Sequence, residues 1–271
     1  MIVEQMLKNA QTPLLHIADV SGSALFNADC MDILPLIPDK SVQLILADLP
    51  YGTTQCKWDN VLDLNKLWSE YKRIISDNGN ILLFSDEPFT SVLICSNLQQ
   101  FRQRITWDKQ VAGNHLNSKK MLLKVTEDIC LFTPSKLGNQ TYNIQLTEKS
   151  KTNIRDREKE NRKEFIGGYV GKHKSTLSKE YSKDKSYPNN LWSINSKESE
   201  CNALNRLHPT QKPIRLIKKL LLTYSNENNM VLDNTMGVGT TCLGAKELNR
   251  SFIGIEKEVK YYDLAVARVF G

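Results

Sequence analysis

Four consecutive residues, Asp48-Leu49-Pro50-Tyr51, place a carboxylate, a rigid backbone and an aromatic ring directly after an apolar run. A planar ring can stack on Tyr51, and its exocyclic amino group can donate to Asp48 and to the Leu49 carbonyl. Such contacts pull the amino hydrogens out of conjugation and favour attack of the nitrogen lone pair on an electrophile. The pattern alone is equally typical of a strand-end turn capped by Asp48.

A second candidate site is a glycine turn. Gly237-x-Gly239 follows a short apolar run and Asp233, precedes a helical pattern, and is followed by a strand that ends at Glu256. Glycines allow a tight turn and close approach to a ligand, and Glu256 is placed to accept hydrogen bonds from two ribose hydroxyls. Cys242 stands where the third glycine of a dinucleotide fingerprint would fall, which disfavours an NAD-linked oxidoreductase and favours a shorter nucleoside ligand.

The third candidate is the hexapeptide that runs from His208 to Pro213 (HPTQKP), immediately before a helical pattern. Lys212 within it is a candidate partner for a ligand carboxylate. Taken alone, an X-Pro turn with a solvated lysine explains the hexapeptide better.

Alternating strand and helix patterns surround these residues. Apolar residues at both odd and even positions of 42–47 indicate a strand buried on both faces. The spacing of apolar residues over 64–75 indicates a helix that Asp77–Gly79 ends. The alternation predicts an α/β sheet with crossover helices. Further strands are expected at 80–85, 102–107, 128–133, 230–232 and 251–256, and further helices at 88–98, 213–224, 241–248 and 260–269.

The glycine-turn unit lies near the end of the 271 residues and is too short to build a sheet alone. Its strands must therefore join those of residues 25–133. We expect the nucleoside site beside the end of the 42–47 strand, at the switch point of one sheet.

Charge is distributed unevenly along the chain. The formal net charge is +6, but residues 1–133 carry −3, residues 134–205 carry +5 and residues 206–271 carry +4. Apolar periodicity fades between 134 and 205, and 155–164 reads as a charged, exposed helix. An ordinary solvated surface explains this charge, but so does a surface that faces nucleic acid. We interpret 134–205 as an insertion into a catalytic domain made of 1–133 and 206–271.

Six cysteines are present without any CxxC pair, which argues against a zinc site, and no metal is expected. No secretory h-region and no apolar run of membrane-spanning length occur. These features favour a cytoplasmic protein with reduced thiols.

The motifs DLPY, HPTQKP and DNTMGVGTT (233–241), in this order, resemble the permuted amino-group DNA methyltransferases of the beta class. The resemblance covers about 26–270, interrupted by 134–205. It includes the 26–34 segment, Trp107-Asp108-Lys109 and Glu127.

The resemblance implies a Rossmann-like, seven-stranded methyltransferase sheet with helices on both faces, circularly permuted, with S-adenosylmethionine as cofactor. Asp48 and the Leu49 carbonyl would hold the amino group of a flipped base, Pro50 would fix the backbone, and Tyr51 would lie against the base. Residues 134–205 would occupy the place of the target-recognition segment. The cofactor-binding residues it implies are Asp29, Cys30, Asp48, Thr210, Lys212, Asp233, Thr235, Gly237, Gly239, Thr240, Thr241 and Glu256.

Two positions depart from the family pattern: Leu49 replaces the usual proline, and Asn234-Thr235-Met236 occupies positions where proline and an aromatic residue are common. The leading Asp48 favours adenine N6 over cytosine N4, which stays an alternative. An RNA adenine methyltransferase is a further alternative, disfavoured because the glycine loop follows the DLPY motif. A catalytically silent DNA-binding module is disfavoured because the motif residues are present.

The expected partner is double-stranded DNA, whose target base must be flipped because it cannot react inside the duplex. A homodimer and a cognate restriction enzyme stay open, as do the recognition sequence and a bacterial or phage origin.

Overall fold

The computed structural model describes residues 2–10, 15–18, 22–52, 62–148, 185–198, 201, 206–208 and 210–271. Two compact units are present: residues 1–143 with 190–271 form the first, and residues 144–189 form the second. The separate unit is shorter at both ends than the predicted insertion 134–205. Within its described residues, the second unit contains one antiparallel pair, β7 (Thr147–Glu148) with β8 (Lys185–Ser186). The predicted helix at 155–164 lies outside the described residues.

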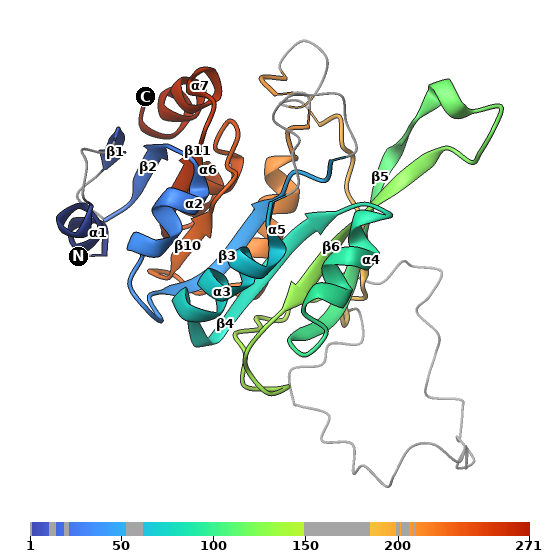
Figure 1. The fold of residues 1–271 in the computed structure, drawn as a ribbon. Helices are drawn as coiled ribbons and strands as arrows, with labels where there is room; N and C mark the ends of the chain where they lie inside the picture. The colour runs from blue at the N-terminus through green and yellow to red at the C-terminus, as the bar shows by residue number, and fades with distance from the viewer. Residues whose placement is uncertain are drawn as a thin grey trace, which may run out of the picture. The chain divides into compact units, whose positions relative to one another are not determined.

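The first unit is built on one large sheet, with strand order β1-β2-β11-β10-β3-β4-β6-β5-β9 (Figure 1). Neighbouring strands from β2 to β4 run parallel, whereas β6 is antiparallel to both of its neighbours. The seven strands from β2 to β5 form the predicted sheet, and β1 and β9 add a three-residue strand at each edge. The strands are β1 (His16–Ala18), β2 (Ala24–Asn27), β3 (Val42–Asp48), β4 (Ile75–Ser85), β5 (Phe101–Gly113), β6 (Lys124–Phe132), β9 (Leu191–Ser193), β10 (Met230–Asp233) and β11 (Ser251–Glu256).

Helices cover both faces of this sheet (Figure 1). One face is covered by α1, α2, η1, α3 and α4, and the other by α5, α6 and α7. Another short 3-10 helix, η2, lies between β5 and β6. The bounds are α1 (Ile2–Asn9), α2 (Cys30–Ile33), η1 (Leu34–Leu36), α3 (Leu64–Ile74), α4 (Phe89–Ser96), η2 (His115–Asn117), α5 (Ile214–Tyr224), α6 (Thr240–Glu247) and α7 (Val259–Phe270).

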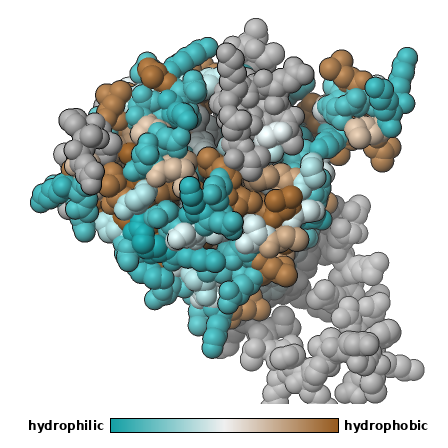
Figure 2. All heavy atoms as spheres, viewed as in Figure 1, coloured by the Kyte–Doolittle hydropathy of each residue, from teal (hydrophilic) through white to brown (hydrophobic). Residues whose placement is uncertain are grey.

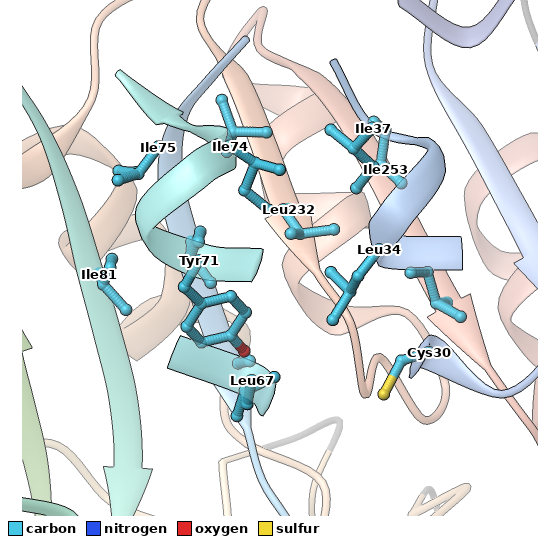
Figure 3. Close-up of a cluster of buried hydrophobic side chains, with 14 of the residues drawn as sticks. Cys30, Leu34, Ile37, Leu67, Tyr71, Ile74, Ile75, Ile81, Leu232 and Ile253 are labelled. Atoms are coloured by element: carbon cyan, nitrogen blue, oxygen red, sulfur yellow. The ribbon is translucent and has the colours of Figure 1, made fainter. Parts of the chain in front are cut away.

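The two hydrophobic cores follow from the alternation of side chains along the buried strands. In β3, Ile45 and Ala47 belong to one core, and Leu44 and Leu46 belong to the other. Figure 3 shows part of the first core, where Tyr71 of α3 lies among aliphatic side chains from η1, β10 and β11. Both faces of β3 are therefore buried, as its continuous apolar run predicted.

The helix predicted over 64–75 is found as α3 and ends one residue earlier, but Asp77–Gly79 are not what ends it. The helix α3 ends at Ile74, and Asp77–Gly79 lie inside β4. Val42 pairs with Ile75, but Leu44 pairs with Asn80, so residues 76–79 bulge out of the ladder. A Cβ at Gly79 would lie 2.9 Å from the Gln43 carbonyl oxygen, so the absence of a side chain lets the bulge pack closely against β3.

The hairpin formed by β5 and β6 extends well past the strands predicted at 102–107 and 128–133 (Figure 1). Its end carries exposed apolar side chains, of which Leu116 is 98% and Leu122 92% exposed (Figure 2). Lys119 and Lys120 are exposed beside them. Among the helices of the described residues, none is long and apolar enough to cross a membrane.

Replacing Gly254 of β11 by alanine should destabilise the first unit. The added Cβ would lie 2.5 Å from Met236 Sδ and 2.6 Å from both Cys242 Sγ and Leu25 Cδ2, so the core must shift. We expect Gly254→Ala to lower the free energy of unfolding by about 1–3 kcal/mol in urea titrations. Gly113→Ala is the control, because its nearest neighbour is the Lys124 carbonyl oxygen at 3.7 Å. Equal stability of the two variants would contradict this packing.

Candidate active site

Four acidic residues lie at the carboxyl ends of four neighbouring parallel strands. Asp29 follows β2, Glu256 ends β11, Asp233 ends β10 and Asp48 ends β3. Because these strands are adjacent, the four acids share one edge of the sheet and line a single cavity of about 810 Å³. The predicted position of the glycine loop beside the end of β3 is therefore found.

Every predicted site residue except Gly239 lines this cavity. Gly239 instead caps α6 with φ of 72°, and a Cβ there would lie 3.0 Å from Ala265 Cβ. Its observed role is the backbone turn and the close packing of α7. The predicted residues that line the cavity are Asp29, Cys30, Asp48, Leu49, Pro50, Tyr51, Thr210, Lys212, Asp233, Thr235, Gly237, Thr240, Thr241 and Glu256.

The glycine loop is tied to the end of β11. The Gly237 N–H donates to Glu256 Oε2 at 2.9 Å, and the Glu258 N–H donates to Oε1 at 2.8 Å. Burial raises the pKa of Glu256, although these backbone donors oppose the shift. Each carboxylate oxygen keeps a lone pair for a further donor, so this side chain can accept from neighbouring hydroxyls.

Asp29 caps the N-terminus of α2, where its Oδ1 accepts from the Met31 N–H at 3.0 Å. Its Oδ2 accepts from Lys257 Nζ at 2.9 Å. Asn27 of β2 also donates to the backbone carbonyls of Glu256 and Lys257. These bonds hold the ends of β2 and β11 together at one wall of the cavity.

Asp233 is the most deeply buried acid of the strand edge, with 4% of its surface exposed. Burial raises its pKa to about 7, although hydrogen bonds from the Thr241 side chain and the Thr235 N–H oppose the shift. Thr235 also donates through Oγ1 to the Asp48 carbonyl at 3.0 Å. The turn after β10 is thus fastened to the end of β3.

Most residues at the two departures from the family pattern are buried. Leu49 is 3% exposed and packs in the first core. Asn234 is 2% exposed, and its Oδ1 accepts from the Tyr71 hydroxyl of α3. Met236 is also buried and lines the cavity.

Both carboxylate oxygens of Asp48 have partners. The Tyr51 hydroxyl donates to Oδ1 at 2.5 Å, and Lys212 Nζ donates to Oδ2 at 2.7 Å. Phe89 stacks against the Tyr51 ring with a centroid distance of 5.3 Å and holds its plane. Burial raises the pKa of Asp48 although the Lys212 ammonium opposes the shift.

Lys212 also lies 3.3 Å from Glu127 Oε2, and Lys109 Nζ lies 3.1 Å from Glu127 Oε1. Burial alone would lower the pKa of Lys212, but Asp48 and Glu127 together raise it. Burial would likewise raise the pKa of Glu127, but Lys212 and Lys109 together lower it. Glu127 and Lys109 were not predicted as site residues; their occurrence in segments similar to the family was the available signal.

The remaining part of the HPTQKP hexapeptide forms another stretch of the wall. His208 Nδ1 accepts from the Thr210 N–H at 3.2 Å, and its ring meets Tyr261 edge-on at 4.3 Å. Burial and the charge of Lys212 lower the pKa of His208 to about 4, so this imidazole is neutral at pH 7. Pro209 lies outside the described residues.

These donors and acceptors suit a nucleoside that carries an amino-acid group. The cavity volume lies within the range of about 300–1,000 Å³ typical of small-molecule sites. Glu256 and Asp29 offer acceptors for hydroxyl and amino groups, and Lys212 offers an ammonium for a carboxylate. In the described parts of the chain, no three His, Cys, Asp or Glu side chains gather as a metal site requires.

A doubly covered sheet with a nucleoside-sized cavity and an amino-group acceptor at its carboxyl edge suits an amino-group methyltransferase. The profile of the DNA methylase family matches residues 42–267. The chain therefore belongs to the DNA methylase family that contains the N6 and N4 amino-methyltransferases. Members of this family take their methyl group from S-adenosylmethionine, so the predicted fold, family and cofactor are confirmed.

Individual proteins are similar to this chain in sequence or in fold. The chain is 29% identical over 262 residues to the type II methyltransferase M1.MboII of Moraxella bovis, which covers 88% of this chain and 92% of the relative. The solved M1.HpyAVI–SAM complex superposes with a TM-score of 0.57 at 22% identity, over 90% of this chain and 98% of the other. The cytosine-N4-specific PvuII DNA methyltransferase superposes with a TM-score of 0.63 at 14% identity, over 90% of this chain and 85% of the other.

The raised pKa of Asp233 predicts a pH-dependent effect of Asp233→Asn. Native Asp233 binds its proton more tightly than the unfolded chain does, so its contribution to stability falls as pH rises from about 4 to about 7 and is constant above. Asparagine does not titrate.

Relative to the parent chain, Asp233→Asn should therefore gain stability between pH 5 and pH 8, by at most about 1.4 kcal/mol per pH unit below 7. Urea unfolding of the ligand-free protein measures this gain. Asp77→Asn, which removes a carboxylate whose side chain is 92% exposed, is the control. A stability difference that is the same at both pH values would show that Asp233 does not titrate as described.

Proposed function

We propose that this DNA amino-methyltransferase transfers a methyl group from S-adenosylmethionine to the N6 amino group of an adenine flipped out of double-stranded DNA. The observation that carries the proposal is the position of Asp48, an aspartate with a half-buried carboxylate that accepts from the Tyr51 hydroxyl at the cavity wall. In this family the leading aspartate favours adenine. Cytosine N4 is the second candidate, supported by the superposition on a cytosine-N4-specific enzyme.

The cofactor is held by residues at the ends of β2, β10 and β11. Glu256 would accept from the two ribose hydroxyls, and Asp29 and Cys30 would lie near the adenine ring. The glycine loop with Thr240 and Thr241 would hold the methionine half, whose carboxylate would meet Lys212. S-adenosylmethionine supplies there an electrophilic methyl group, whose transfer to the amino nitrogen leaves a thioether and releases one proton.

The target base is held by residues at the end of β3. Asp48 and the Leu49 carbonyl each accept a hydrogen bond from the amino group. These bonds direct the nitrogen lone pair out of the ring plane. Pro50 fixes the direction of that carbonyl, and Tyr51 lies against the base. Catalysis then consists of positioning and electrostatic stabilisation, without a covalent enzyme intermediate.

Other parts of the chain would contact DNA outside the cavity. We assign target recognition to residues 134–205, whose net charge of +5 suits a polyanion. Val111, Ala112 and Gly113 of β5 line the cavity. Beyond them, the end of the β5–β6 hairpin carries Lys119 and Lys120 near exposed leucines, a combination suited to phosphates and base edges. This function is consistent with action in the cytoplasm of a bacterium or a phage-infected cell. It is also consistent with a homodimer and with a restriction partner.

Expression in a host without DNA methylation tests the function. Genomic DNA is digested to nucleosides, and mass spectrometry should find N6-methyladenine in the DNA. Asp48→Ala should lower its formation at least 100-fold, on the order of the loss of one transition-state hydrogen-bonding group. The purified variant should still bind S-adenosylhomocysteine, which shows that it is folded.

Each other result has a definite meaning. Detection of N4-methylcytosine alone would show that cytosine N4, the second candidate, is the target. Unmodified DNA would remove the DNA methyltransferase function, and full activity of Asp48→Ala would remove the assigned role of Asp48.

A further inference from the structure

Four charged side chains form a continuous chain at the inner wall of the cavity. From Lys109 the contacts run to Glu127, then to Lys212 and then to Asp48, with separations of 3.1, 3.3 and 2.7 Å. The two ammonium groups and two carboxylates alternate, and their charges cancel. The side chain of Lys212 is only 9% exposed, so a partner that it loses cannot be replaced fully by water.

This arrangement leaves Asp48 occupied. Its Oδ1 accepts from Tyr51 and its Oδ2 accepts from Lys212. A base amino group that approaches Oδ2 meets an ammonium, which is itself a donor. Each oxygen of Asp48 keeps one lone pair, but an ammonium at 2.7 Å repels the positive charge that builds on the base nitrogen during methyl transfer, so this acceptor is masked for the reaction while Lys212 stays there.

Lys212 can also pair with a carboxylate other than that of Asp48. An ammonium carries three N–H donors on a flexible four-carbon stem, so it can keep Glu127 while it exchanges Asp48 for another carboxylate. Lys109 contacts Glu127 through the other oxygen and holds that carboxylate in place. The thioether cofactor product and the cofactor itself both carry such a carboxylate, and Lys212 lines the cavity proposed to hold them.

We propose that Lys212 is a positioning residue that leaves Asp48 for the carboxylate of the bound cofactor, so that Asp48 becomes available to the target base only in the loaded enzyme. This inference rests on the proposed function. It predicts that the cofactor enters before the base, since the base acceptor is uncovered by the cofactor. Glu127 stays with the ammonium in both states and is the fixed point of the exchange.

Nuclear magnetic resonance of ¹⁵N-lysine-labelled protein can follow the change of partner at Lys212. The signal of a buried ammonium is observable because its protons are replaced slowly by those of water. The Lys212 signal is assigned from its loss in Lys212→Met. We expect S-adenosylhomocysteine, which has the carboxylate, to shift this signal. We expect 5′-methylthioadenosine, which has the same nucleoside and thioether without the amino-acid group, to leave it unchanged.

Calorimetry gives an independent readout with a definite sign. Asp48→Asn removes the carboxylate that competes for Lys212, so it should bind S-adenosylhomocysteine roughly 5- to 10-fold more tightly. Its affinity for 5′-methylthioadenosine should stay within about twofold. Asp86→Asn is the matched control, because Asp86 lines the same cavity but pairs with Lys124. It should change neither affinity by more than about twofold.

The results separate this inference from the proposed function. If S-adenosylhomocysteine binds but the Lys212 signal does not move, or if 5′-methylthioadenosine moves it equally, the exchange is wrong and the function stands. Unchanged or weaker binding by folded Asp48→Asn also overturns the exchange. If the parent chain binds neither nucleoside, the proposed function fails and the exchange fails with it.

Discussion

The ammonium of Lys212 lies between the carboxylates of Asp48 and Glu127 in the cavity wall, and the Lys212 side chain is only 9% exposed. Buried charges are tolerated only when they are paired, so the positions of these three side chains are mutually constrained. Asp48 ends β3, Glu127 lies in β6 and Lys212 precedes α5. The pairing therefore fastens together three elements that are distant in sequence, Asp48 and Lys212 being 164 residues apart.

The sheet makes this pairing possible. Parallel strands end at one edge, so β2, β11, β10 and β3 deliver Asp29, Glu256, Asp233 and Asp48 to the same cavity. Four acids so close together would be unfavourable if all of them were buried and charged. The negative charge is compensated or reduced differently at each strand. Backbone N–H groups donate to Glu256, and lysines pair with Asp29 and Asp48. Burial raises the pKa of Asp233 to about 7.

Local patterns predicted most of the strands and helices at the site, but not β2 or α2, which position Asp29 and Cys30. The strand 251–256 was predicted with its observed bounds, and the apolar run 42–47 needed only Asp48 added. These predictions succeeded because buried parallel strands have continuous apolar runs and because glycine, proline and acidic residues mark their ends. The bulge at 76–79 and the three-residue strand β9 were missed, since both depend on contacts with a neighbouring strand.

The candidate site was predictable as far as each motif is local. Asp48, Tyr51, Glu256 and the glycine loop were predicted because each lies at the end of a recognisable strand or shortly after it. Neither the contacts of Glu127 nor the partner of Lys212 was predicted, because they arise from the register of an antiparallel hairpin and from the packing of α5. Gly239 was predicted to bind the cofactor and does not line the cavity; the space beside it is filled by α7, a tertiary neighbour that spacing does not show.

A double-mutant cycle of Asp48→Asn and Lys212→Met, measured by urea unfolding of the ligand-free protein, tests the central claim most directly. Each single variant leaves the other residue without its ionic partner. Because both variants remove the same Asp48–Lys212 contact, the stability loss of the double variant should be smaller than the sum of the two single losses. We expect a coupling free energy of at least about 1 kcal/mol between the two positions. Additive effects, within the ~0.5 kcal/mol typical of independent sites, would contradict the claim that this ion pair ties β3 to the segment before α5.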